Sequence, residues 1–347
     1  LNVQYVVEGS VRKAGNRVRV TAQLIDARTG ASIWGERYDR EQEDLFEVQD
    51  EVVRIITATL VGRVALAHRD SVQRASTANL DAHDWFTQGR ELFYKASRSD
   101  NAKAMAMFKK AISLDPDYAA AHALLSESYV RDWLTFWNEP LETSFEHAWE
   151  AGTRAMLLDD TDSRSQTAMG IAHMFSGNLD QAKFYLDQAL KLNPSDTHAM
   201  IYRARQDVFS GSPERAIKRI EEALLYNPYG KYNWYLVPAY YAARRYEEAL
   251  RMLKNIHNPT SIMRSWEVAA AAQIGDLHSA QRAAEQFISA ASEMLGGDRI
   301  PGSWFDFLME RYPAEPDIRE HYADGLRMGG LIKRMKNPLC VETQIAL

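Results

Sequence analysis

A period of 34 residues constrains the fold of this chain more than any other feature of its sequence. The segments GIAHMFSGNLDQAKFYLDQALKLNP and ARQDVFSGSPERAIKRIEEALLYNP align without a gap. Their shared small residues and prolines are Gly170 and Ala204, Gly177 and Gly211, Ala182 and Ala216, Ala189 and Ala223, and Pro194 and Pro228. Two antiparallel helices approach closely only where side chains are small, and a glycine commonly ends a helix. The period therefore predicts stacked helical hairpins.

Hairpins repeated every 34 residues are typical of tetratricopeptide (TPR) repeats, which the chain resembles at these positions. Weaker copies flank the pair at residues 85–116, 125–155, 236–253 and 275–280. Two further segments, Trp304–Met309 and Ile318–Leu326, are expected to close the array as a helical cap, because an end repeat must cover its last apolar face. The expected fold is mostly α, a TPR-type α-α superhelix of about six repeats.

The first 70 residues follow a different pattern, which predicts β-strands. Between Arg17 and Leu24 polar and apolar residues alternate, which is the period of a half-buried antiparallel strand. Turn sequences on both sides indicate hairpins, and Val3–Arg12 and Ala31–Tyr38 are predicted as the flanking strands. From Asp44 onward apolar residues recur at helical spacing, so we predict a helix across one face of the sheet.

These patterns divide the chain into four parts. We expect a small α+β element over residues 1–70, a linker over 71–80, the TPR superhelix with its cap over 81–332, and a disordered tail over 333–347. A three-stranded sheet has two open edges, and one helix covers only one of its faces. We therefore expect the sheet to be completed by residues preceding Leu1, by other residues of the chain or by a second copy. A homodimer through the sheet edge is the form expected for the isolated chain.

Charge and cysteine content limit the expected partners. The net charge of −6 and the pI near 5.9 lack the basic footprint of nucleic-acid binders, so no nucleic acid is expected as a partner. The basic residues Arg12, Lys13, Arg17 and Arg19 are interpreted as a solvated sheet face. A single cysteine, Cys340, excludes a disulfide framework, which favours the cytoplasm, with the periplasm as the alternative. No apolar run reaches the roughly 18 residues that a membrane span requires.

Sequence motifs that carry catalytic chemistry are absent. The chain has no HExxH zinc motif, no GxSxG elbow, no P-loop and no dinucleotide-binding glycine pattern. His122 and His173 occupy repeat positions on predicted first helices, so we interpret both as structural. Cys340 has no base near it in the sequence and is not expected to act as a nucleophile. We therefore predict a chain with no catalytic residues, no metal site and no cofactor.

Residues 5–60, from YVVEGSV to ITATL, resemble the end of the TolB-like (FlgO-like) N-terminal domain. That domain precedes TPR arrays in many proteobacterial class III adenylate/guanylate cyclases and in winged-helix transcriptional regulators. The likeness rests on Glu8-Gly9-Ser10 with Arg12, on RVRVTAQLIDARTG, IWGERYD and FEVQDEV, and on the closing YADGLRMGGLI. The cyclase catalytic domain has no counterpart in this sequence, so no catalytic residue is transferred. The resemblance implies a regulatory or assembly region.

The first helices of a TPR superhelix form its concave surface, and the repeat offsets place eight side chains there. They are Arg164 and Phe175, then His198, Arg205 and Phe209, then Lys231, Trp234 and Tyr241. Cationic and aromatic side chains on one surface suit an acidic or carboxylate-ended peptide. Phe175 and Phe209 are equally compatible with packing between repeats. The other six side chains form the predicted peptide groove.

A cluster of aromatic residues interrupts the second repeat between its two helices. It holds Trp133, Phe136, Trp137 and Pro140. Aromatic surface is costly to leave in water, so we expect this insertion to fold back onto the array. The alternative is an exposed patch that binds a partner.

These observations favour a non-catalytic protein-interaction and regulatory module. In this interpretation the groove binds a peptide or protein partner and relays that state to an upstream output domain. The alternative is the regulatory C-terminal part of a class III adenylate/guanylate cyclase, whose cAMP-forming domain lies outside this sequence, or of a winged-helix transcriptional regulator.

Overall fold

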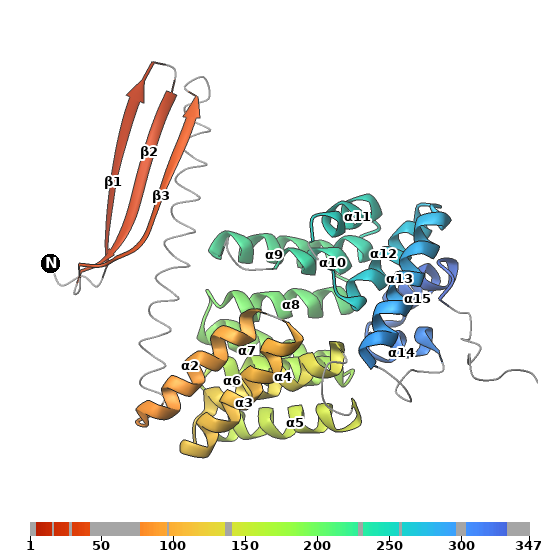
Figure 1. Ribbon diagram of the computed structural model, residues 1–347, viewed down its shortest axis with the longest axis horizontal. Helices are drawn as coiled ribbons and strands as arrows, with labels where there is room; N and C mark the ends of the chain where they lie inside the picture. The colour runs from red at the N-terminus through yellow and green to blue at the C-terminus, as the bar shows by residue number, and fades with distance from the viewer. Residues whose placement is uncertain are drawn as a thin grey trace, which may run out of the picture.

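The computed structural model describes residues 5–15, 17–27, 30–41, 77–95, 97–135, 141–227, 232–256, 259–295 and 303–331. Within these ranges the chain forms a three-stranded sheet followed by fourteen α-helices and one short 3-10 helix (Figure 1). All the strands in these ranges precede residue 45, and the helices form a TPR-like superhelix, as the sequence predicts.

The sheet is an antiparallel meander of β1 (Tyr5–Ala14), β2 (Arg17–Asp26) and β3 (Ser32–Glu41), in that spatial order. Gly15 and Gly30 take φ values of +61° and +69° in or beside the two turns, a backbone region that favours glycine. The predicted helix from Asp44 and the linker up to residue 76 lie outside the described residues.

Within the described residues, six helical pairs build the array. The first three pairs are α2 (Leu80–Lys95) with α3 (Arg98–Leu114), α4 (Ala119–Thr135) with α5 (Leu141–Leu158), and α6 (Ser163–Phe175) with α7 (Leu179–Leu192). The next three are α8 (Thr197–Phe209) with α9 (Pro213–Tyr226), α10 (Leu236–Ala242) with α11 (Tyr246–Lys254), and α12 (Ser261–Gln273) with α13 (Leu277–Leu295). The 3-10 helix η1 (Asn233–Tyr235) leads into α10.

Small residues let the helices of a pair approach closely. A Cβ atom added at Gly170 of α6 would lie 2.6 Å from Cγ of Leu186 on α7, so a side chain there would force the two helices apart. Gly177 and Gly211 take φ values of +85° and +71° just after the first helix of their repeats. Both positions confirm the physical reasons for small residues at these offsets.

Two further helices follow the last pair and pack at the C-terminal end of the array. α14 (Trp304–Glu310) and α15 (Pro316–Met328) follow the last pair, and α15 packs against α12. Tyr322, Ala323 and Leu326 of α15 are buried in that contact. The close approach depends on Gly325, where an added Cβ atom would lie 2.8 Å from Cβ of Ala269. The predicted tail over 333–347 lies outside the described residues.

The aromatic insertion of the second repeat is described only at its start. Trp133, near the end of α4, is half-buried. Its ring centroid lies 5.2 Å from that of Phe145 and 6.0 Å from that of Phe175, so this side chain packs back onto the array. Phe136, Trp137 and Pro140 lie outside the described residues.

Candidate peptide-binding groove

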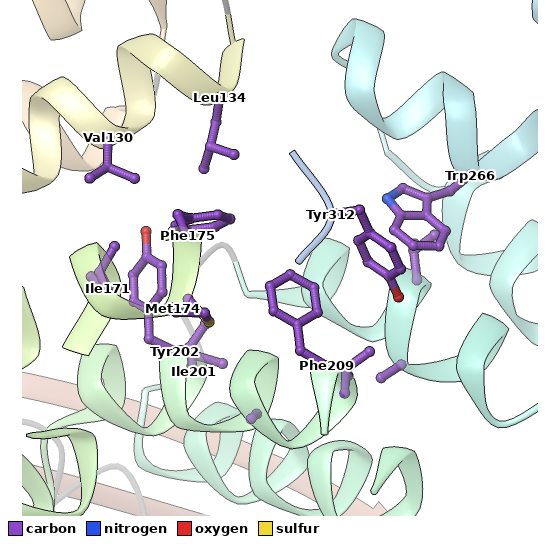
Figure 2. Packing of buried hydrophobic residues seen from close by; sticks show 14 of the residues in the cluster. Val130, Leu134, Ile171, Met174, Phe175, Ile201, Tyr202, Phe209, Trp266 and Tyr312 are labelled. Atoms are coloured by element: carbon purple, nitrogen blue, oxygen red, sulfur yellow. The ribbon is translucent and has the colours of Figure 1, made fainter. Parts of the chain in front are cut away.

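One row of side chains on α8 forms the centre of the predicted groove. His198, Tyr202, Arg205 and Phe209 are spaced four, three and four residues apart, which places them on one side of the helix. In Figure 2, Phe175 and Tyr202 lie beside Val130 and Leu134 of α4, and Phe209 lies beside Tyr312, which follows α14. Helices from both ends of the array therefore meet at α8.

The N-terminal end of this row is closed by α2 and α4. His198 Nε2 hydrogen-bonds to the carboxylate of Glu127, which is buried. The rings of Phe93 and Tyr94 meet the imidazole edge-on, with centroids 6.1 and 6.0 Å away. Arg131 donates to the carbonyl oxygen of Phe93 and stacks on its ring, 3.7 Å from the centroid. The first, second and fourth repeats are thus joined across the concave surface.

Arg205 lies further along the row, after Tyr202, and has a different environment. Its guanidinium carbon is 4.7 Å from the ring centroid of Phe175 and 5.5 Å from that of Phe209. Burial lowers the pKa of Arg205 from its ordinary value, and the groups that oppose this shift are Tyr235, Tyr202 and Tyr312, with no carboxylate among them. Within the described part of the chain, Arg205 has no carboxylate partner. Aromatic faces therefore hold this cation while its N–H donors are not taken up by an acid.

A small cavity of about 20 Å³ adjoins Arg205, enough room for about one water molecule. Its lining includes five aromatic side chains, namely Phe209, Trp234, Tyr235, Trp266 and Tyr312, together with the aliphatic residues Val208, Pro238 and Ile262. The hydroxyl of Tyr312 is buried, and no other group in the described residues bonds to it. The cavity thus combines a cation, aromatic walls and one hydroxyl without a partner.

The C-terminal end of the groove is filled by the chain's own cap. The amide of Glu315 donates a hydrogen bond of 2.8 Å to the carbonyl oxygen of Phe209 at the end of α8. The ring centroid of Tyr312 lies 5.0 Å from that of Phe209 and 5.3 Å from that of Trp266. Tyr241 is only 1% exposed, and its hydroxyl donates to the carbonyl oxygen of His321 at 2.8 Å.

The structure therefore brings together only part of the predicted groove. Arg205 and Trp234 line one cavity, whereas His198 is engaged with Glu127 and Tyr241 is covered by α15. Arg164 lies at the start of α6, where its Nε is 3.0 Å from a carboxylate oxygen of Asp162. Lys231 lies outside the described residues.

Three aromatic side chains of the cavity are not among the residues that the repeat offsets select. Tyr312 belongs to the cap, where the repeat offsets that located the groove no longer apply. Tyr235 and Trp266 also line the cavity, but the repeat offsets do not select them. Trp266 has a signal in the sequence, because it is an aromatic residue on α12, the first helix of its repeat.

His122 and His173 are held by packing and hydrogen bonding. The imidazole of His122 lies 3.0 Å from the carbonyl oxygen of Pro116, and that of His173 stacks on the ring of Tyr185 with centroids 5.2 Å apart. Burial lowers the pKa of both side chains. In the residues that the structure describes, no three His, Cys, Asp or Glu side chains converge as metal ligands. None of the helices in those residues is long and apolar enough to cross a membrane.

Comparison with known proteins agrees with the repeat pattern. One family model described as a tetratricopeptide repeat matches residues 97–118 and 163–196, and a second matches residues 207–253. The chain therefore contains TPR repeats.

A curated relative is "Putative adenylate cyclase 3" of Rhizobium meliloti (strain 1021). It is 36% identical over 185 residues, which cover 53% of this chain and 31% of the relative. The match thus spans about a third of the relative's length.

Two solved structures share a distant likeness. Pseudomonas aeruginosa pilF is 18% identical over 60% of this chain and 91% of its own, with a TM-score of 0.39. TTC0263, a thermophilic TPR protein of Thermus thermophilus, is 17% identical over 59% of this chain and 97% of its own, with a TM-score of 0.41.

Proposed function

We propose that this chain is a non-catalytic protein-interaction and regulatory module, and that Arg205 binds a carboxylate of a protein partner. The TPR repeats support protein binding in general. A carboxylate ligand is supported by the environment of the Arg205 guanidinium, which faces aromatic rings and has no carboxylate beside it in the described residues. A planar guanidinium offers paired donors that match a carboxylate, and its partial desolvation strengthens such a pair.

The size of the cavity sets how this binding proceeds. A space for about one water cannot hold a carboxylate with its flanking chain, so the side chain of Tyr312 has to move aside. The indole of Trp234, half-buried on the wall of the same cavity, then offers a surface for the apolar part of the partner. In the proposed complex, a partner carboxylate replaces the unpaired Tyr312 hydroxyl beside Arg205.

A second candidate function is the regulatory part of a class III adenylate/guanylate cyclase. It is supported by the 36% identity over 185 residues to a protein named as an adenylate cyclase. In this proposal, residues 1–70 are the end of a TolB-like domain that connects the TPR array to an upstream output domain. The two functions are compatible, because partner binding in the groove would be the signal that is relayed.

The role of Arg205 can be tested with a defined acidic probe. Fluorescein-labelled hexaglutamate with a free C-terminus should bind the wild-type chain, and its affinity should fall as the salt concentration rises. Arg205→Gln should weaken that binding roughly tenfold or more, because a charge-assisted hydrogen bond is lost. Fluorescence anisotropy measures both affinities.

Arg282→Gln is the matched control, because it removes one exposed arginine on α13. It should leave the affinity within about twofold of wild type, since surface charge alone contributes little. Melting temperatures of both variants report whether the fold persists. Equal binding by wild type and Arg205→Gln would contradict the proposal, as would an equal loss in the Arg282→Gln control.

A further inference from the structure

The edge of the N-terminal sheet formed by β1 is open in the described part of the chain. β1 is ten residues long and pairs with β2 along its whole length, from Tyr5 opposite Asp26 to Ala14 opposite Arg17. This pairing has no register shift, and β1 contains no proline. Such an edge presents a row of backbone donors and acceptors to any further strand, and natural proteins usually shield it.

Apolar side chains accompany this open backbone. Val7 and Val11 of β1 are 51% and 71% exposed, whereas Val18 of β2 on the same sheet face is only 6% exposed. The apolar face thus extends from the covered centre of the sheet to its uncovered edge. A strand added beside β1 would cover these two valines as well as the backbone groups.

The order of charges along β1 is complementary to itself in the antiparallel direction. Glu8 lies two residues before Ser10, and Arg12 lies two residues after it. When two β1 strands pair antiparallel with Ser10 on a twofold axis, each Glu8 lies directly opposite Arg12 of the second copy. All three side chains are exposed in the single chain. Opposite charges in directly opposed positions stabilise a strand pair.

Neighbouring registers lack this complementarity. An axis at Glu8 would oppose two glutamates, and an axis at Arg12 would oppose two arginines, which destabilises the pair in each case. An axis at Gly9 or Val11 places no acid directly opposite a base. With the axis at Ser10, Val7 and Val11 of the two copies are diagonal neighbours on the apolar face. Charge complementarity therefore favours one register, and it favours a second copy of β1 as the added strand.

We propose that β1 is a homodimerisation strand: two copies of this chain pair antiparallel through β1, with Ser10 at the twofold axis. The two three-stranded sheets then become one continuous sheet, in which Glu8 and Arg12 form an ion pair on each side of the axis. This surface is distinct from the α8 groove, and neither proposal depends on the other.

Disulfide trapping tests the register directly. Directly opposed residues of an antiparallel pair have Cα atoms about 4.5–5.5 Å apart, within the range of a disulfide. Ser10→Cys in a Cys340→Ser background should therefore form a covalent dimer under mild oxidation. Arg37→Cys in the same background places an exposed thiol on β3 and is the control. The proposal is overturned if Ser10→Cys stays monomeric, or if Arg37→Cys cross-links equally well.

Charge reversal tests the ion pairs without a covalent trap. Glu8→Arg or Arg12→Glu alone opposes like charges twice per dimer, so each should weaken dimerisation about tenfold in sedimentation equilibrium. The double variant Glu8→Arg/Arg12→Glu restores opposite charges and should return to within about threefold of wild type. A folding defect would worsen with the second substitution instead of recovering. A wild-type chain that stays monomeric at all concentrations, or a double variant that does not recover, would refute the dimer.

Discussion

At the scale of single residues, the turn between the helices of the third to sixth repeats shows how strongly backbone conformation selects side chains. Gly177, Gly211 and Gly275 occupy this turn with φ values of +85°, +71° and +80°. The fifth repeat has Arg244 at the corresponding position, with φ +61°. This conformation brings the Cβ atom of an L-residue too close to the following carbonyl oxygen, so Arg244 carries a local strain that glycine avoids.

Arg244→Gly should therefore stabilise the chain. Relief of the left-handed strain outweighs the extra backbone entropy of glycine, and the free energy of unfolding should rise by about 0.5–1 kcal/mol. Arg244 is exposed, so few other contacts are lost. Gly211→Ala is the complementary change and should lower the free energy of unfolding by about 1–2 kcal/mol. Urea denaturation measures both values, and a destabilised Arg244→Gly variant would contradict the argument.

At the scale of elements, aromatic packing joins α15 and the segment before it to α12, but hydrogen bonding in this cluster is incomplete. Tyr312 and Tyr322 both pack on Trp266, with centroids 5.3 and 4.0 Å from the indole. The hydroxyl of Tyr322 lies 2.7 Å from Ser265 Oγ, whereas that of Tyr312 has no partner in the described residues. One ring therefore contributes a satisfied hydroxyl to the cluster and the other an unsatisfied one.

Removal of the Tyr312 hydroxyl and removal of the Tyr322 hydroxyl should change the free energy of unfolding in opposite directions. Tyr312→Phe deletes a buried polar group without a partner, so the free energy of unfolding should rise by about 1 kcal/mol. Tyr322→Phe breaks the bond to Ser265 and should lower it by about the same amount. The two substitutions remove the same atom from neighbouring rings, so each controls for the other in thermal unfolding. Destabilisation by both would show that Tyr312 has a hydrogen-bond partner.

At the scale of the whole molecule, the helical array is closed on itself. In an open solenoid each repeat contacts only its neighbours, and stability propagates from one repeat to the next. Here α15 contacts α8, α10 and α12, and the bond between Glu315 and Phe209 joins the cap to the fourth repeat. At the other end of the array, Glu127 and Phe93 contact His198, which also lies on α8. Both ends of the array thus stabilise α8.

This closure predicts that a destabilising substitution in the cap also destabilises α8 in the middle of the array. Leu326 of α15 is fully buried, so Leu326→Ala should lower the free energy of unfolding by about 2–5 kcal/mol. Amide hydrogen exchange should then lose protection in α8 as well as in α12 and α13. Met328→Ala, half exposed on the same helix, is the control and should change neither region. Loss of protection confined to α12–α15 would indicate an open solenoid.

Much of the fold could be predicted from the sequence, because its determinants are local or periodic. Alternation around Val18 marked the strands, and the 34-residue spacing of Gly170 and Ala204 located the helix crossings. The cap could be predicted because an apolar helix such as that around Leu326 needs a surface to cover. Less of the groove could be predicted: the offsets located Arg205 and Trp234, but they also selected Tyr241, which α15 buries.

The sequence by itself determined which segments become strands and helices and which helices pair, since each of these follows from residues a few positions apart or one period apart. Tertiary structure decided what the concave surface contains. The contacts of His198 with Glu127, of Phe209 with Tyr312 and of Tyr241 with His321 join residues from separate repeats or from the cap. The same closure leaves Arg205 among aromatic rings without an acidic partner in the described residues. These features depend on how the superhelix closes, and no local pattern encodes that, because closure sums the small rotations between many successive helices.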